Sequence, residues 1–157
     1  MSEKPDALVP PMIRQGQIIQ ELSAQLPDRV PGDWVVLELV DRSLSMYGQV
    51  EMRAQRFDGT WESVRAPRST NDFLEELRDV MYRPGVGTWF SLKWTLTKDA
   101  TGETSTDVVF NYDEEPDWSR PIEPGLYGID LEDFPRDDEH IPEWLRGRLA
   151  EAERNAK

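Results

Sequence analysis

Residues 87–112 read GTWFSLKWTLTKDATGETSTDVVFNY, and this segment decides the fold class. Apolar and polar residues alternate in both halves, which is the period of a β-strand that buries one face. The turn sequence KDATG at residues 98–102 joins the halves, so they predict an antiparallel hairpin with one apolar and one wet face. The apolar face of the first half is predicted to carry Phe90, Leu92, Trp94 and Leu96, with Trp89 on the wet face.

Upstream of this hairpin the sequence predicts three more strands. Residues 34–40 form a dense apolar and β-branched run, interrupted only by Glu38, which is typical of a well-buried strand. Residues 47–57 alternate between apolar and polar side chains, and the chain returns over residues 60–64. Asp58-Gly59 lies between them and favours a hairpin turn, because both residues tolerate a positive φ.

Two amphipathic helices are predicted around these strands. Residues 12–26 and the segment from Ser69 or Thr70 to Pro84-Gly85 each carry apolar residues at helical spacing. The order of helix, three strands, helix, two strands and helix predicts an α+β fold. We therefore expect a mostly antiparallel sheet of about five strands with helices packed on one face. The two predicted stripes consist of Ile18, Ile19, Leu22 and Leu26, and of Phe73, Leu74, Leu77, Val80 and Met81.

The composition changes after Tyr112. Residues 113–139 are rich in acidic side chains and proline, yet they also carry large apolar residues that a disordered tail would lack. This predicts an extended, partly docked segment, followed by a helix from about Ile141. The expected organisation is a flexible N-terminus (1–11), an α+β core (12–118), and an acidic extension with a C-terminal helix docked on the core (119–157).

The charge balance narrows the classes of partner. Asp and Glu number 31 against 18 Lys and Arg, which gives a net charge of −13 and an isoelectric point near 4.5. A field of this sign repels nucleic acid and anionic membranes, and it speeds encounter with basic proteins. There is no cysteine, secretory signal pattern or long apolar run, so we expect a cytoplasmic protein.

Signals for catalysis are sparse. His140 is the single histidine and, without cysteine, has few candidates for a nucleophile–base pair. Gly85-Val86-Gly87 is too short for a phosphate-binding loop and follows a helix rather than a strand. The 113–117 stretch lacks the spacing of an EF-hand calcium loop. We therefore expect no cofactor, no metal and no enzymatic activity.

The acidic segment is the candidate binding site, because aromatic residues are set among its charges. Interfaces are enriched in Trp and Tyr anchors, and an anionic rim steers a basic partner. The predicted partner-binding residues are Asp113, Glu114, Glu115, Asp117, Trp118, Tyr127, Asp130, Glu132 and Asp133.

The last hairpin carries a family resemblance. Residues 87–92 and 107–114, with Phe110, Tyr112 and Asp113 as a Phe-x-Tyr-Asp signature, resemble the YezG-like immunity proteins of bacterial polymorphic-toxin systems. The resemblance covers about residues 12–118. It implies a protein that binds the toxic C-terminal domain of a cognate secreted toxin and blocks its active site. Such a toxin would be a basic nuclease or an NAD-degrading enzyme, and the acidic segment would cover its cleft.

Two other classes of function stay open at this point. One is a small enzyme acting on a cationic substrate, with Asp107, Asp113 and His140 around a cleft. A deep pocket holding these groups, or a carboxyl pKa near neutral, would favour it. The other is an acidic adaptor or chaperone for a secreted protein, which would keep its partner soluble without inhibiting it.

Overall fold

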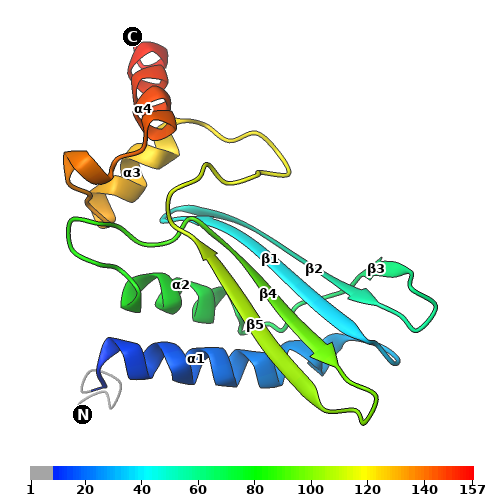
Figure 1. The fold of residues 1–157 in the computed structure, drawn as a ribbon. Coiled ribbons are helices and arrows are strands. Elements are labelled where there is room, and N and C mark those ends of the chain that lie inside the picture. Colours follow the sequence, from blue (N-terminus) through cyan, green and yellow to red (C-terminus); the bar gives the residue numbers. More distant parts are fainter. Residues whose placement is uncertain (1–8) are drawn as a thin grey trace.

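In the computed structural model, which describes residues 9–157, five antiparallel strands form one sheet in the order β3-β2-β1-β4-β5 (Figure 1). The strands are β1 Val36–Leu44, β2 Tyr47–Gln55, β3 Trp61–Ser63, β4 Ser91–Lys98 and β5 Thr104–Asn111. The helices are α1 Pro11–Gln25, α2 Thr70–Val80, α3 Gly125–Asp133 and α4 Glu143–Asn155, with short 3-10 turns at Leu26–Arg29 and Asp138–His140. This confirms the predicted α+β class and the five-stranded sheet.

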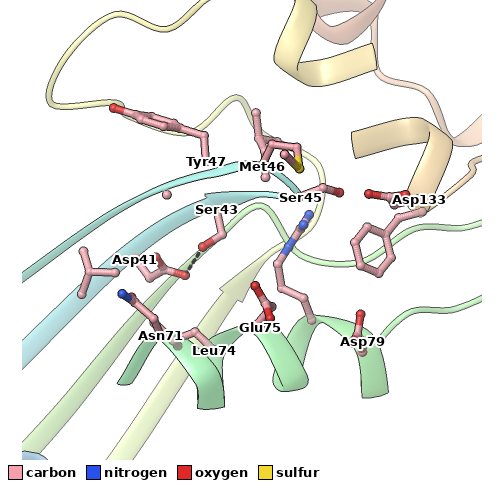
Figure 2. Close-up of a pocket in the computed structure, with 15 residues that line it drawn as sticks. Asp41, Ser43, Ser45, Met46, Tyr47, Asn71, Leu74, Glu75, Asp79 and Asp133 are labelled. Atoms are coloured by element: carbon pink, nitrogen blue, oxygen red, sulfur yellow. Dashed lines mark hydrogen bonds between the residues drawn. The ribbon is translucent and has the colours of Figure 1, made fainter. Parts of the chain in front are cut away.

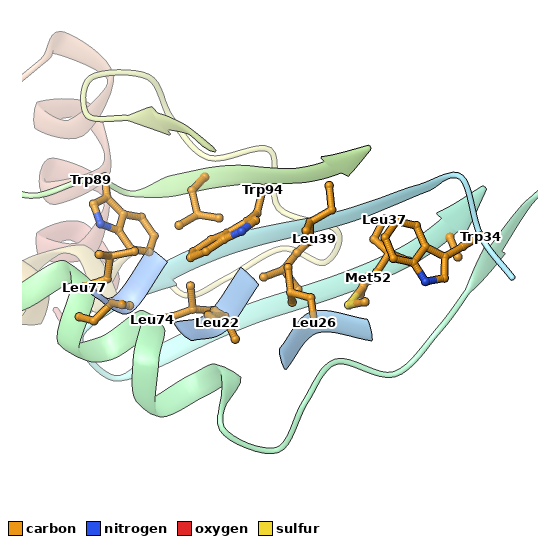
Figure 3. Close-up of a cluster of buried hydrophobic side chains, with 14 residues drawn as sticks. Leu22, Leu26, Trp34, Leu37, Leu39, Met52, Leu74, Leu77, Trp89 and Trp94 are labelled. Carbon is orange, nitrogen blue, oxygen red and sulfur yellow. The ribbon is translucent and has the colours of Figure 1, made fainter. Parts of the chain in front are cut away.

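The main core lies between the sheet and helices α1 and α2, which cover one of its faces (Figure 1). Alternate residues of β1, such as Leu37 and Leu39, point to this face and pair with β2 and β4. They meet Leu22 of α1 and Leu77 of α2 in one cluster (Figure 3). Because helices α1 and α2 cover this face, most of the β1 residues on it are expected to be apolar.

The start of β4 differs from the prediction. Trp89 was predicted on the wet face, but it is 0% exposed and belongs to the main core. Phe90 instead lies in a second apolar cluster with Tyr127 and Leu145. The physical reason is that β4 begins only at Ser91, after Gly87 with a φ of +117°, so the strand alternation does not extend back to these residues.

The acidic extension contains a helix that the sequence did not predict. Residues 113–139 were expected to be irregular, yet Gly125–Asp133 forms α3, with Tyr127 and Asp130 on its buried side. Glycines and acidic residues weaken the apolar stripe by which such a helix is recognised. The helix predicted from about Ile141 is present as α4, and Leu145 is its buried residue.

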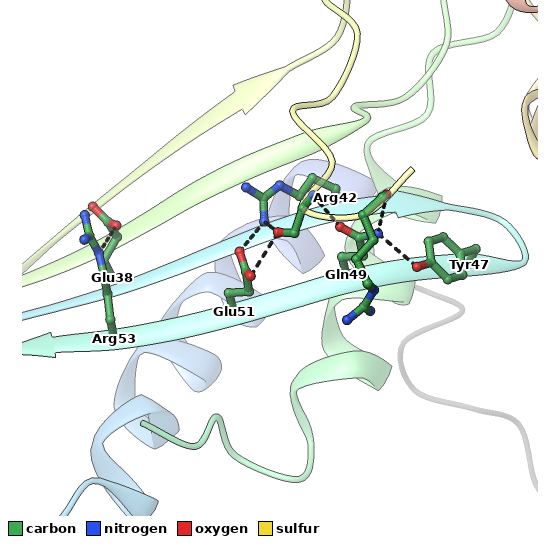
Figure 4. Close-up of polar contacts among 8 residues, drawn as sticks. Glu38, Arg42, Tyr47, Gln49, Glu51 and Arg53 are labelled. Carbon is green, nitrogen blue, oxygen red and sulfur yellow. Dashed lines mark hydrogen bonds and ion pairs between the residues drawn. The ribbon is translucent and has the colours of Figure 1, made fainter. Parts of the chain in front are cut away.

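The C-terminal part attaches to the core at one end of the sheet. Residues 113–124, yellow in Figure 1, cross the face opposite to α1 and α2 before α3 begins. There the side chain of Gln49 accepts a hydrogen bond from Ser119 N at 2.8 Å and donates one to the carbonyl of Arg120 at 3.1 Å (Figure 4). Arg42 and Glu51 form an ion pair. The Ser119 hydroxyl accepts a hydrogen bond from Arg42 and donates one to Glu51.

Part of the predicted flexible N-terminus, residues 1–8, lies outside the described residues. Within residues 9–157, no helix combines the length and the apolar character needed to cross a membrane.

Candidate functional site

A cavity of about 750 Å³ opens where the β1–β2 turn approaches helix α2 and the end of α3 (Figure 2). Its size is within the range of ligand-binding pockets. Four acidic residues line it, and they come from three different elements. Asp41 comes from β1, Glu75 and Asp79 from α2, and Asp133 from α3.

Asp41 is the buried member of the four acidic residues that line this cavity. It follows Leu37 and Leu39 on the helix-covered face of the central strand, where it is 0% exposed. The hydroxyl of Ser43 donates a hydrogen bond to Oδ2 at 2.5 Å, but Oδ1 has no hydrogen-bond partner in the described part of the chain. Burial raises the pKa of the Asp41 carboxyl to about 6, against the lowering effects of the Ser43 hydrogen bond and of Arg78 and Arg42.

The rim of the cavity concentrates negative charge. Glu75 and Asp79 are four residues apart on α2, so their side chains lie on the same face of the helix. Burial raises the pKa of Asp79 above its ordinary value, and the nearby carboxylates of Glu75, Glu76 and Asp133 add to this, while Arg78 opposes it. A cation in the cavity would relieve this repulsion between like charges.

Arg78 is the only basic residue among those that line the cavity in the described chain. Its charge is already compensated, because Nη1 and Nη2 donate to Asp130 Oδ1 and Oδ2 at 2.7 and 3.2 Å. Nε donates to the carbonyl of Trp89 at 2.9 Å. With Arg78 neutralised in this way, the remaining carboxylates leave the cavity negative.

The β1–β2 turn adds an apolar element to the rim. Met46 lines the cavity with 70% of its surface exposed. Methionine adapts its shape to a partner surface at little cost, and it is enriched in interface cores. An acidic cavity beside an exposed methionine is an arrangement suited to a basic protein partner.

Two of the predicted contact residues are buried in the folded chain. Tyr127 is 1% exposed and Asp130 is 2% exposed, and both side chains are bonded within the fold, so neither offers free surface to a partner in the unbound chain. The Tyr127 hydroxyl accepts a hydrogen bond from Trp118 Nε1 at 2.9 Å and donates one to Glu115 at 3.2 Å. Asp130 holds Arg78 and also accepts bonds from the backbone N–H and the hydroxyl of Ser45.

Two more predicted contact residues are engaged inside the fold. Glu115 forms an ion pair with Arg148 of α4 at 2.8 Å. Trp118 is half-buried, and its ring packs against Tyr47 with 5.9 Å between the centroids. Trp118 and Tyr127 therefore hold the extension onto the core.

The remaining five predicted residues are exposed but do not form one group. Asp113, Glu114 and Asp117 lie along the loop after β5, whereas Glu132 and Asp133 lie at the end of α3. Only Asp133 lines the acidic cavity. The predicted acidic segment is thus divided between the loop, the interior and the cavity.

The groups named for a possible enzyme do not line this cavity either. Asp107 is exposed on β5, Asp113 is exposed at its end, and His140 lies in the 3-10 turn before α4. Among residues 9–157, no three His, Cys, Asp or Glu side chains converge in a way that could hold a metal ion.

Sequence reasoning missed Asp41, the central residue of the site. The predicted strand ended at Val40, and the observed strand continues to Leu44. The alternation Leu37, Leu39, Asp41 was the available signal, since it places a carboxylate at a core-facing position. No protein-family model matches the chain, and no curated protein matches it.

Proposed function

We propose that this chain is a protein-binding inhibitor of a basic toxin domain, an immunity protein, and that the acidic cavity is the centre of its interface. The observation that carries the proposal is that Asp41, Glu75, Asp79 and Asp133, which come from three elements, all line one cavity. The resemblance of the last hairpin to YezG-like immunity proteins supports the same function.

The charge distribution explains how such an inhibitor would work. A net charge of −13 steers a basic domain toward the chain and raises the association rate. The exposed Met46 beside the cavity supplies an apolar anchor, around which the carboxylates exclude partners of the wrong charge. A toxin that binds nucleic acid has a basic active-site surface, which the acidic cavity and rim would cover.

The test of the function begins with capture from the lysate of the native organism at low salt, with bound proteins identified by mass spectrometry. The captured protein is then expressed with and without this chain. A toxic C-terminal domain that is neutralised by co-expression supports the proposal. A partner that is not toxic, or whose activity is unaffected by binding, contradicts it.

The place of the interface is tested by two variants that each lose three exposed carboxylates and therefore have the same net charge. The cavity variant should bind the captured partner about tenfold or more weakly, whereas the loop variant should stay within about threefold. Equal losses would show that only the overall charge matters and that the cavity is not the interface. The cavity variant is Glu75→Gln, Asp79→Asn and Asp133→Asn; the loop variant is Asp113→Asn, Glu114→Gln and Asp117→Asn.

One observation favours a second candidate function, an enzyme acting on a cationic substrate. Asp41 has a pKa of about 6 in a cavity, which is a property of general bases. The neighbouring hydroxyl group is that of Ser43, which donates a hydrogen bond to the Asp41 carboxyl. Turnover of a basic substrate that is lost in Asp41→Asn would support this alternative. An adaptor or chaperone, by contrast, would keep its partner soluble and leave its activity intact.

A further inference from the structure

The cavity contains a charged group that the fold leaves incompletely bonded. Asp41 is fully buried on the central strand, and its Oδ1 accepts no hydrogen bond from the described residues. A buried polar atom without a partner costs free energy, and native structures rarely retain one without a reason. Its position in the wall of a cavity provides a reason, because a ligand in the cavity can supply the missing donor.

The chemistry of the walls indicates the kind of ligand. The acidic residues that line the cavity are acceptors when ionised, so the ligand must be a donor and positively charged. The described residues do not converge as metal ligands, which favours an organic cation. Leu74 and Phe134 contribute apolar surface to the same cavity, and a guanidinium group packs on such surface better than a strongly hydrated ammonium group.

We propose that the cavity receives the guanidinium group of one arginine side chain of the basic partner and that Asp41 is its counter-ion. The identity of the partner rests on the proposed function, but the binding of a guanidinium group does not. The planar fork of an arginine matches carboxylates bidentately, so Asp41 and a rim carboxylate can share its donors. Because Asp41 is fully buried, the wall of the cavity must relax slightly before a ligand can reach its carboxyl group. The exposed side chain of Asn71 lies beside Asp41 and is the part of the wall that we expect to move (Figure 2).

Gly48 keeps the space beside Asp41 open. It lies opposite Ser43 on β2, and a Cβ atom added to it would be 3.4 Å from Ser43 Oγ and 4.0 Å from Asp41 Oδ1. These are ordinary van der Waals distances, so the backbone tolerates a side chain here. We expect Gly48→Val to fill the space in front of Asp41 while every carboxylate remains in place.

The inference is tested first without the partner, with Nα-acetyl-arginine amide as the probe. In titrations followed by amide NMR, we expect this probe to shift the resonances of Ser43, Gly48 and Asn71 with a millimolar Kd. The neutral isostere Nα-acetyl-citrulline amide should cause no such shifts. Asp41→Asn and Gly48→Val should each weaken binding of the arginine probe about fivefold or more, whereas the exposed Asp107→Asn should not. Absence of shifts with the arginine probe, or unchanged binding by Asp41→Asn, overturns the inference.

The same two variants separate this inference from the proposed function. If Asp41→Asn and Gly48→Val still bind and neutralise the captured toxin as the wild type does, the arginine site is wrong although the function stands. If the arginine probe binds and no toxin is neutralised, the cation site stands and the function is wrong. Two-dimensional NMR spectra of each variant, compared with the wild type, establish that the fold is retained.

Discussion

Arg78 of α2 and Asp130 of α3 form a buried, two-bond ion pair that joins the C-terminal helices to the core. The side chains of both residues are less than a twentieth exposed, and the two bonds measure 2.7 and 3.2 Å. Arg78 also lies over the ring of Phe134, 4.8 Å from its centroid. The pair is therefore part of the boundary between the apolar core and the acidic cavity.

Removing one member of this pair should be strongly destabilising. Asp130→Ala leaves the Arg78 charge buried without its counter-ion, and we expect a loss of about 3–5 kcal/mol in the free energy of unfolding. The measurement is urea unfolding followed by tryptophan fluorescence. Glu62→Ala, which breaks the more exposed pair with Arg56, should cost less than about 1 kcal/mol. If both variants lose a similarly small amount of free energy of unfolding, the buried pair does not stabilise the fold more than an exposed pair does.

The buried carboxyl of Asp41 should make stability depend on pH in an unusual direction. Its folded pKa of about 6 exceeds its ordinary value of 3.8, so the folded state holds the proton more tightly than the unfolded state. Stability contributed by this group is complete below its unfolded pKa and is lost as the pH rises through about 6. The shift corresponds to roughly 3 kcal/mol at most.

Asp41→Asn isolates this effect, because asparagine keeps an oxygen for the Ser43 hydroxyl and cannot ionise. We expect the variant to gain stability over the wild type by up to roughly 3 kcal/mol near pH 8 and by much less near pH 4. Urea unfolding at both pH values measures the difference, with Asp107→Asn as the control that should show none. A variant that is less stable than the wild type at both pH values contradicts the assignment. A more stable variant that binds arginine less well would mark Asp41 as retained for function.

The alternation of apolar and polar residues, together with the turn residues, was sufficient to predict the sheet. It failed where tertiary contacts determine which side chains are buried. The alternation of residues 47–57 predicted β2 because one face of that strand packs on helices and the other does not. At Trp89 and Phe90 the backbone leaves the strand conformation, and two separate clusters bury the two rings. No local pattern contains that information, since the second cluster is completed by Tyr127 and Leu145 far along the chain.

The sequence predicted an acidic binding site, but it did not predict where the acidic cavity lies in the fold. The acidic composition led us to expect a basic partner, and Asp133, one of the predicted residues, lines the cavity. Asp41, Glu75 and Asp79 line the same cavity as Asp133 only because the β1–β2 turn, α2 and α3 lie together at one end of the sheet. The sequence did not show that Tyr127 is buried, because a tyrosine at an interface and a tyrosine that pins a loop look the same in sequence.

The contact between Gly87 and Arg136 should be sensitive to a single methyl group. Gly87 has a φ of +117°, and a Cβ atom there would lie 2.6 Å from the guanidinium carbon of Arg136. That guanidinium is buried, and it donates to the carbonyl groups of Thr88, Tyr112 and His140. Gly87→Ala should therefore cost about 2–4 kcal/mol, because strain and displacement of Arg136 add together.

Gly147→Ala is the matched control for this variant. Gly147 lies within α4 with no atom near its added Cβ, so alanine there should stabilise the chain by about 0.5–1 kcal/mol. Thermal unfolding of both variants compares the two glycines directly. If Gly87→Ala unfolds at the same temperature as the wild type, the close approach of the Arg136 guanidinium to Gly87 does not contribute to stability.

Tyr127→Phe separates a structural role of this tyrosine from a role in binding. The hydroxyl accepts from Trp118 and donates to Glu115, and burial raises its pKa to about 12, so it stays protonated at neutral pH. Its removal leaves the Trp118 indole N–H and part of the Glu115 carboxylate unsatisfied, which should lower the free energy of unfolding by about 1–2 kcal/mol. Because the ring is buried, affinity for the captured partner should be unchanged when binding is measured well below the unfolding temperature. An affinity loss of tenfold or more in a variant that is still fully folded would instead show that Tyr127 becomes exposed in the complex.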